Sequence, residues 1–225
     1  MNDTYRLYKL KVGYQGMYNY SYIIMDQATG KAAIVDPAWD LGRITTMLAD
    51  LGAEVTMILL THSHYDHVHL VEPLVNQFQP KVYMSSKEID YYQFHSLNLC
   101  SFADEDEIML GETKIICLLT PGHTAGGSCF LLSASLLAGD TIFVEGCGIC
   151  DTPGGCPDQM YQSVQKIRNV VDPSVRVYPG HSYGKEPGYP LSYLLKNNIY
   201  FQFENKEQFI KFRMRKNQKN LFDFK

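Results

Sequence analysis

The segment Thr61–His67 holds three histidines and an aspartate directly after an apolar, strand-like run. Neutral imidazole nitrogens and ionised carboxylates are the ligands that zinc and related metals bind in proteins. Because side chains alternate along a strand, His62 and His64 would point to the same side where the strand ends. Asp66 and His67 would begin the next helix and face back toward that strand end. The spacing therefore predicts a metal-binding loop that could supply ligands to two adjacent metal positions, rather than a polar surface loop or core histidines.

Three further candidate ligands follow other strand-like runs. His123 and His181 each come after an apolar run and a Pro-Gly turn. Asp140 ends the run Leu-Leu-Ala-Gly-Asp, which makes it a candidate for a ligand shared by two metals. Four separate strand ends thus offer metal ligands.

These motifs occur in the order H-x-H-x-D-H, P-G-H-T, G-D and P-G-H. In this order and with these gaps, the chain resembles the metallo-β-lactamase superfamily from about Tyr5 to His181, and most closely its glyoxalase II-like branch. Over its whole length it is also similar to the zinc-dependent hydrolases encoded alongside bacterial trans-acyltransferase polyketide synthases of the bacillaene type.

The resemblance implies two metal positions and one shared ligand: His62, His64 and His123; Asp66, His67 and His181; and Asp140 between them. Two zinc ions per chain suit this set, and iron or manganese can occupy the same ligands. Bound zinc lowers the pKa of water to about 7, so a metal-bound hydroxide could attack a thioester carbonyl. Asp66 and Asp140 would serve catalysis by holding the metals. A thiolate leaving group needs little protonation, which favours thioester hydrolysis.

Three nearby polar residues are not expected to be ligands. Asp36, before Pro37, matches a recurring acidic position of the superfamily, and we expect it to support a ligand or form a turn. His69 is expected to pack or to hydrogen-bond a ligand, and His95 to lie on the surface of a polar helix.

Length and composition favour one soluble domain over residues 1–225. The chain has 45% hydrophobic residues and a net charge of −4, with no linker or repeat. It lacks the global positive charge typical of nucleic-acid binding, and no apolar run approaches the ~20 residues needed to span a bilayer. Nothing resembles a signal peptide. We expect a cytoplasmic protein with no nucleic-acid or membrane partner, and no oligomeric state is predicted.

Apolar periodicity predicts strands and helices in an α+β order. Strands are expected at 7–12, 18–25, 32–36, near 55, near 82, at 108–110, 115–119 and 129–132, and near 175. Helices are expected at 41–51, 66–78, 86–95 and 158–170. This order implies two sheets face to face. The resemblance completes it as a four-layer αββα sandwich, the metallo-β-lactamase fold, with the metal site along one rim.

The six cysteines do not predict a second chemistry. Cys147 and Cys150 have C-x-x-C spacing, with Cys156 close behind, but a zinc ribbon needs a second pair. A redox C-x-x-C is expected at a helix start, whereas this one lies in a glycine-rich loop. The remaining cysteines are expected to be small buried residues: Cys100, Cys117 and Cys129. No disulfide is expected in a reducing compartment.

The loop after Asp140 bears on the substrate. In glyoxalase II this loop reads C-G-K/R, and the cation helps to hold a carboxylate of glutathione. Here Ile149 takes the place of the cation, and Asp151 would repel a carboxylate. A pantetheine arm has no carboxylate near its sulfur and suits this loop better. Tyr183 matches a position that contacts the thiol carrier, although it could instead cap its loop.

The C-terminal segment 204–225 is basic and aromatic in an otherwise acidic chain. Its cations outnumber Glu207 and Asp223: Lys206, Lys211, Arg213, Arg215, Lys216, Lys219 and Lys225. It could meet phosphate or the acidic surface of a carrier protein, and Arg213 and Lys216 are candidate substrate-binding residues. The alternative is a solvated tail held down by its aromatic residues: Phe209, Phe212, Phe222 and Phe224.

The leading hypothesis is a metal-dependent thioesterase that removes acyl groups from the phosphopantetheine arm of an acyl carrier protein in polyketide biosynthesis. Three alternatives stay open. They are glyoxalase II, a persulfide dioxygenase with a single iron, and a non-enzymatic metal-binding or scaffolding protein.

Overall fold

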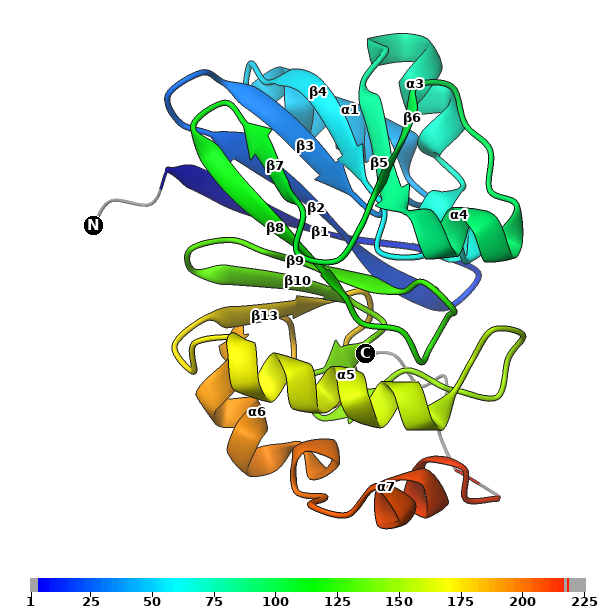
Figure 1. Cartoon of the computed structure of the whole chain (residues 1–225). Helices are drawn as coiled ribbons and strands as arrows, with labels where there is room; N and C mark the ends of the chain where they lie inside the picture. The colour runs from blue at the N-terminus through cyan, green and yellow to red at the C-terminus, as the bar shows by residue number, and fades with distance from the viewer. Residues whose placement is uncertain (1–3, 217, 219–225) are drawn as a thin grey trace.

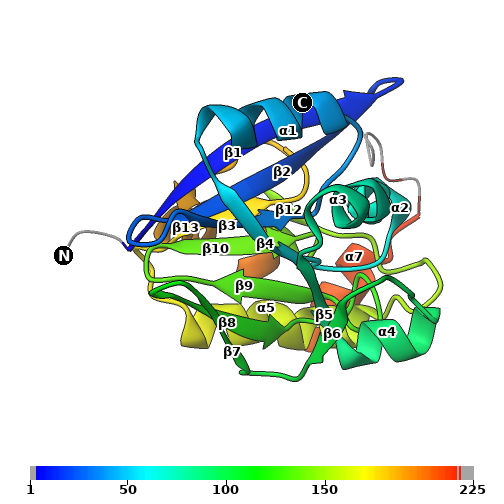
Figure 2. The same ribbon diagram turned by 90° about the horizontal axis from the view of Figure 1, so that it is seen from above.

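The computed structural model describes residues 4–216 and 218 and contains two six-stranded sheets that face each other (Figures 1 and 2). The first has the order β1-β2-β3-β4-β5-β6, with the bounds Tyr5–Tyr14, Met17–Asp26, Lys31–Val35, Glu54–Leu59, Lys81–Ser85 and Leu99–Phe102. The second has the order β14-β13-β10-β9-β8-β7, with the bounds Tyr189–Pro190, Arg176–Pro179, Ser135–Gly139, Ser128–Leu131, Thr113–Leu119 and Glu107–Leu110. A ribbon of β11 (Ile142–Phe143) and β12 (Gly146–Cys147) lies beside the second sheet.

Both faces of the first sheet are buried, because its central strands are apolar at consecutive positions. In β2, Ile23 packs on the outer face while Ile24 packs between the sheets. In β3, Ala33 faces the second sheet and Ile34 faces away from it. This alternation is the period of two that a strand imposes on its side chains.

Helices cover the outer face of each sheet (Figure 1). On the first sheet they are α1 (Leu41–Asp50), α3 (Val71–Phe78) and α4 (Ser86–Tyr92). On the second they are α5 (Pro157–Val170) and α6 (Leu191–Asn197), and α7 (Lys206–Arg213) packs against α5. The apolar spacing of three and four residues buries one face of each helix. The four-layer αββα sandwich is therefore confirmed. None of the described helices is both long and apolar enough to cross a membrane.

The strands that precede the candidate ligands end at one rim of the molecule. Strands β3, β4 and β5 are parallel, and β10 is parallel to β13. Strand β8 also runs with β10, since both are antiparallel to β9. In Figure 2 the arrowheads of β8 and β10 point toward the side on which α2 (Tyr65–Val68) and α7 lie. The loops after β4, β8, β10 and β13 therefore meet at the same edge.

Two predicted helices differ from the structure. The helix expected at 66–78 is divided into α2 and α3, because Pro73 has no N–H to donate and the Leu70 N–H bonds instead to the Pro37 carbonyl at 3.3 Å. Helix α4 ends at Tyr92 rather than at residue 95, since Gln93 takes a left-handed backbone with φ 52°. His95 is exposed, as expected, but lies in the loop that follows the helix.

The C-terminal segment is more structured than the sequence predicted. Strand β14, helices α6 and α7 and the 3-10 helix η1 (Ile199–Phe201) were not predicted there, and earlier in the chain strand β6 was not predicted either. Phe209 is fully buried and Phe212 packs against the same apolar cluster, so these aromatic residues hold the segment down, as the alternative expected, but within a folded helix. Some residues of the predicted segment lie outside the described part of the chain: Lys219, Phe222, Asp223, Phe224 and Lys225.

Candidate metal centre

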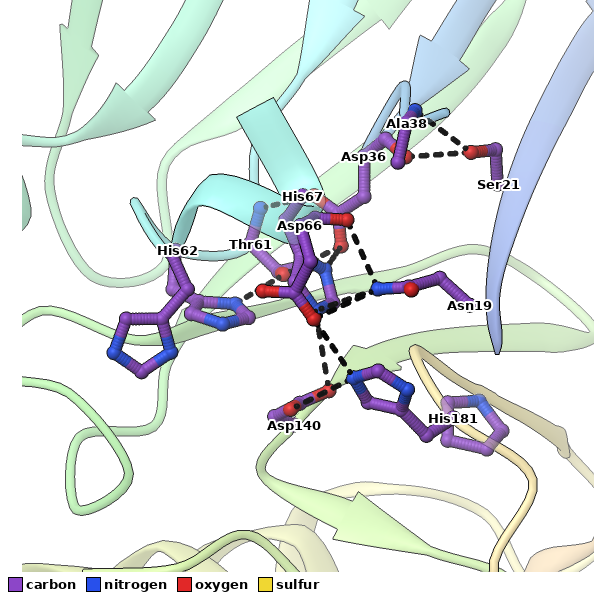
Figure 3. Close-up of polar contacts among 12 residues, drawn as sticks. Asn19, Ser21, Asp36, Ala38, Thr61, His62, Asp66, His67, Asp140 and His181 are labelled. Carbon is purple, nitrogen blue, oxygen red and sulfur yellow. Dashed lines mark hydrogen bonds and ion pairs between the residues drawn. The ribbon is translucent and has the colours of Figure 1, made fainter. Parts of the chain in front are cut away.

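The seven predicted ligands come together at the rim where the strands end. Among these seven residues, two groups of three have ligand atoms within 4.8 Å of one another, and Asp36 forms a further such group with His62 and His67. We name the first the His62 group (His62, His64 and His123) and the second the His181 group (Asp66, His67 and His181). In Figure 3, the side chains of Asp66, Asp140 and His181 converge. The loop after β4 and the start of α2 thus supply candidate ligands to both groups.

Asp140 lies between the two groups. Its Oδ2 is 3.6 Å from Nε2 of His123 and 3.4 Å from Nε2 of His181, and its Oδ1 is 3.6 Å from Nε2 of His67. Gly180, before His181, makes room for this approach, because a Cβ there would meet the Asp140 carboxylate at 2.5 Å. The carboxylate therefore occupies the position expected of a ligand shared by two metals.

Hydrogen bonds outside the site orient the imidazole rings. Four rings place Nδ1 within 2.7–3.0 Å of an oxygen: His62 at Thr61 Oγ1, His67 at Asp36 Oδ2, His123 at the Ile149 carbonyl and His181 at the Tyr18 carbonyl. When Nδ1 donates its proton outward, Nε2 of the neutral ring keeps a lone pair for a metal. His64 is turned the other way, with Nδ1 at 3.0 Å from Nε2 of His123.

The residues fit a bound metal ion. His62 Nε2 and Asp140 Oδ1 are buried, and neither has a hydrogen-bond partner within the described part of the chain. A buried polar atom without a partner is unfavourable, and a metal ion would satisfy both atoms. Three imidazoles with one open position are a ligand set that catalytic zinc uses.

Charge divides the metal-free site into two halves. Burial lowers the pKa of His67, but Asp66, Asp140 and Asp36 outweigh burial and raise that pKa to about 9. For His181, Asp140 and Asp66 likewise overcome burial and raise the pKa to about 10. Burial raises the pKa of the Asp66 and Asp140 carboxyls, yet the neighbouring histidines hold both pKa values well below their usual range. The His181 group therefore holds two protonated rings and an ionised Asp66 at neutral pH, beside the ionised Asp140.

The His62 group is neutral by contrast. Burial, together with the nearby imidazoles, holds the pKa of His62 well below its ordinary value. Burial also lowers the pKa of His64, and it lowers the pKa of His123 to about 4 even though Asp140 opposes the shift. These rings can therefore bind a metal at pH 7 without losing a proton.

Asp36 supports the ligands from the end of β3. Its carboxylate accepts hydrogen bonds from Thr61 N at 2.8 Å, Thr61 Oγ1 at 2.6 Å and His67 Nδ1 at 3.0 Å. Asp36 adopts φ 47°, a left-handed backbone that is uncommon for residues other than glycine. His69 accepts a hydrogen bond from Trp39 N at 3.2 Å and packs on the Trp39 ring, which is the packing role expected for it.

The sequence did not reveal Glu88, which is fully buried in α4. Its Oε1 accepts from N and Oγ of Ser63, and its Oε2 accepts from Gly126 N, each at 2.8 Å. Glu88 thus ties the loop of His62 and His64 to the loop of His123. The S-x-x-E pattern from Ser85 to Glu88 predicts only a helix start, so no local signal marks this contact.

Asn19 and Trp39 are two further supporting residues that the sequence did not reveal. Asn19 Nδ2 donates to the Asp66 carboxylate at 3.0 Å and to the Asp66 carbonyl at 2.9 Å (Figure 3). Its Oδ1 accepts from the Trp39 indole N–H at 2.7 Å. The β2 strand is therefore linked through Asn19 to a candidate ligand.

A cavity of about 320 Å³ opens onto both groups of ligands. Its lining includes Met17, Trp39 and Tyr65, which we name the aromatic wall although Met17 is aliphatic, and Arg213, Arg215 and Gln218, which we name the C-terminal wall. Among the predicted substrate-binding residues, the structure brings three to this cavity: Ile149, Tyr183 and Arg213. Lys216 is exposed and does not line it.

The cysteines near the cavity are packed rather than activated. Cys147 and Cys150 are buried, and burial raises the pKa of Cys147 to about 11 and that of Cys150 further above its ordinary value. Cys117 and Cys129 are also buried, as predicted, whereas Cys100 is only half-buried. All six are unpaired.

Known proteins share the motifs and the fold. A family model described as "Metallo-beta-lactamase superfamily" matches residues 14–181. The chain is 56% identical, over 100% of both lengths, to a protein of Bacillus subtilis (strain 168) named "Probable polyketide biosynthesis zinc-dependent hydrolase PksB". It is 34% identical to a hydroxyacylglutathione hydrolase of Pseudomonas fluorescens (strain SBW25), over 73% of this chain and 62% of that protein. The crystal structure of ETHE1 from Myxococcus xanthus superposes with a TM-score of 0.84 at 26% identity, covering 96% of this chain and 95% of that one.

The family match covers the segment that carries every candidate ligand, from the end of β1 to His181. The hydroxyacylglutathione hydrolase match also bears out the glyoxalase II-like resemblance. With the αββα layers and the ligand loops on one rim, the chain belongs to the metallo-beta-lactamase superfamily.

Proposed function

We propose that this chain is a zinc-dependent hydrolase that cleaves acyl thioesters on the phosphopantetheine arm of an acyl carrier protein in polyketide biosynthesis. The observation that carries the proposal is the pair of ligand groups joined by Asp140 beside a cavity of about 320 Å³. The relative named as a polyketide biosynthesis zinc-dependent hydrolase supports the metal and the biosynthetic setting.

The residues of the cavity suit hydrolysis of a thioester. Zinc held by the two groups would supply a nucleophile from water at neutral pH and polarise a carbonyl. Asp140 contacts a histidine of each group, so it would hold the two metal positions next to each other. Asn19 holds Asp66 toward the site through its amide. A thiolate leaves without first taking a proton, so the residues need not supply a general acid.

The loop that carries Ile149 supports a pantetheine thiol over glutathione. The Ile149 carbonyl accepts from His123 Nδ1 at 2.7 Å, which fixes this loop against the His62 group, and the residue lines the cavity. An isoleucine offers no charge to a carboxylate. Asp151 is exposed and does not line the cavity. The uncharged side chain at position 149 suits the amides of a pantetheine arm.

The proposal is tested by loading the purified protein with zinc or with iron and following two reactions. Thiol release from an acetylated, phosphopantetheinylated carrier protein by the zinc form is the expected result. Oxygen consumption with glutathione persulfide by the iron form, without thiol release from the carrier, would replace the proposal with a dioxygenase. If neither metal form catalysed either reaction, the result would favour a metal-binding protein without this activity.

A further inference from the structure

Arg213, the last residue of α7, is only 5% exposed at the wall of the cavity. Its Nη1 donates to the Cys147 carbonyl at 3.3 Å and to the Tyr200 hydroxyl at 3.0 Å, and its guanidinium lies 5.8 Å from the centre of the Tyr200 ring. Its Nε is buried and has no acceptor in the described residues. No carboxylate of residues 4–216 or 218 lies within ion-pair distance of it.

The positive charge of Arg213 has no anionic partner among the described residues. An arginine side chain stays protonated, and a buried cation needs an anionic partner to offset the loss of its hydration. The carbonyl and the hydroxyl that it contacts are neutral acceptors, and they leave the N–H at Nε without an acceptor. The position of Arg213 on a wall of the cavity means that a partner could come from a bound molecule.

Two further residues of the C-terminal wall line the cavity beside Arg213. Arg215 also lines the cavity, and its guanidinium is held 3.9 Å above the Phe212 ring. Gln218 lines the cavity as well, and its Nε2 donates to the carbonyls of Arg213 and Arg215 at 2.9 and 3.1 Å. The segment after α7 is therefore folded so that two guanidinium groups border the cavity. The aromatic wall, by contrast, offers Met17, Trp39 and Tyr65 to an uncharged part of a ligand.

We infer that the C-terminal wall is an anion-binding subsite for the thioester substrate, with Arg213 as its principal residue. The inference rests on the proposed thioesterase function. Planar guanidinium groups bind phosphate and carboxylate oxygens through paired hydrogen bonds, so the ligand group is an anionic oxygen group. It can come from the phosphate of the carrier arm or from a carboxylate on the acyl chain.

The first experiment compares zinc-loaded wild-type protein on two pairs of substrates. Acetyl-4′-phosphopantetheine against acetyl-pantetheine tests the phosphate, and succinyl-pantetheine against butyryl-pantetheine tests the acyl carboxylate. A charge-assisted contact predicts a preference in kcat/KM of about tenfold to a hundredfold for the anionic member of one pair. A ratio near one in both pairs overturns the inference, whether or not any variant folds.

The second experiment replaces Arg213 with methionine, which keeps an unbranched apolar side chain but removes the charge. R213M is expected to lower kcat/KM for the anionic substrate much more than for the neutral one, and so to abolish the preference. Lys211→Met is the matched control, because Lys211 is exposed on the same helix and does not line the cavity. If R213M lowers the turnover of anionic and neutral substrates by the same factor, Arg213 is structural and the inference is wrong.

Binding gives a readout that does not depend on turnover. The S-propyl thioethers of 4′-phosphopantetheine and pantetheine cannot be hydrolysed, and calorimetry measures their Kd with the zinc-loaded protein. If the phosphate is the anion, the phosphorylated thioether binds more tightly to wild type and to K211M but not to R213M. Where the substrate pairs point to the acyl carboxylate, the S-(3-carboxypropyl) and S-butyl thioethers replace this pair. Hydrolysis of thioesters without any anion preference contradicts this inference alone, whereas no hydrolysis of any thioester contradicts the proposed function.

Discussion

At the residue scale, the centre depends on a few side chains that each contact several others. Asp140 contacts His67, His123 and His181, so it joins the two groups of ligands. Asp36 and Asn19 act one step further out, by holding His67 and Asp66. Such outer contacts fix the tautomer and direction of a ligand, and their loss generally weakens metal affinity.

The substitution Asp140→Asn removes the charge while keeping the size of the side chain. Because both groups lose a shared anionic ligand, we expect kcat to fall by more than about a hundredfold and the zinc content per chain to decrease. Steady-state kinetics and elemental analysis of the purified variant measure both. Asp151→Asn is the control, since Asp151 is exposed and does not line the cavity. Near-full activity of D140N would refute a shared ligand.

The charges of the His181 group predict how the metal-free protein responds to pH. The pKa values of His67 and His181 are raised to about 9 and about 10, above the ~6.5 of an unfolded histidine. The stability that this provides is complete below pH ~6.5 and is lost as the pH rises through 9 to 10. We therefore expect the Tm of the metal-free protein to fall between pH 7 and 10.

The zinc-loaded protein is the control for that titration, because bound zinc replaces the protons on both rings while other groups titrate as before. Differential scanning calorimetry of both forms measures the difference. Parallel Tm curves from pH 7 to 10 would show that these two rings are not held protonated by Asp66 and Asp140.

At the element scale, what the sequence could predict depended on whether the signal was local. The apolar runs and Pro-Gly turns placed strand ends before His123 and His181, and the structure has β8 and β13 there. The division of the helix at 66–78 could have been inferred from Pro73. The role of Glu88 could not, because its partners lie 25 and 38 residues away. Contacts of this kind exist only after the layers have packed.

Helix α4 gives an element-scale prediction through Glu88. Glu88→Gln weakens the hydrogen bonds that join the loops of the His62 group, and we expect a loss of roughly 1–3 kcal/mol in the free energy of unfolding. Zinc affinity should decrease as well, because the loops of His62 and His123 lose their common anchor. Chemical denaturation and chelator competition measure the two effects. Glu72→Gln, on the exposed face of α3, should change neither, and equal effects in both variants would remove the special role of Glu88.

At the scale of the whole molecule, parallel strands from two sheets end at one rim, and the loops there build both the metal centre and the cavity. The order of the motifs along the chain allowed the position of the site at this rim to be predicted, because the superfamily resemblance covers the loops that carry the candidate ligands. The C-terminal wall was predicted only as a basic segment. Its Arg213 reaches the cavity because α7 packs on α5 through residues such as Phe209, a long-range arrangement with no local sequence signal.

The substitution Ile149→Arg tests how the cavity selects its thiol. An arginine here would offer a cation to a carboxylate of glutathione, so kcat/KM for lactoylglutathione should rise by about tenfold, the effect of roughly 1.4 kcal/mol. The matched change Ile149→Met keeps the wall neutral and should leave that value unchanged. An unchanged value in I149R would mean that this loop does not set specificity.

The account is tested most directly by one comparison of kcat/KM. The zinc-loaded protein is assayed on an acetylated, phosphopantetheinylated carrier protein and on lactoylglutathione at the same pH. We predict a preference for the carrier thioester of at least about tenfold, equivalent to ~1.4 kcal/mol of transition-state binding. Equal values, or a preference for lactoylglutathione, would contradict the assignment of the cavity to a pantetheine thioester.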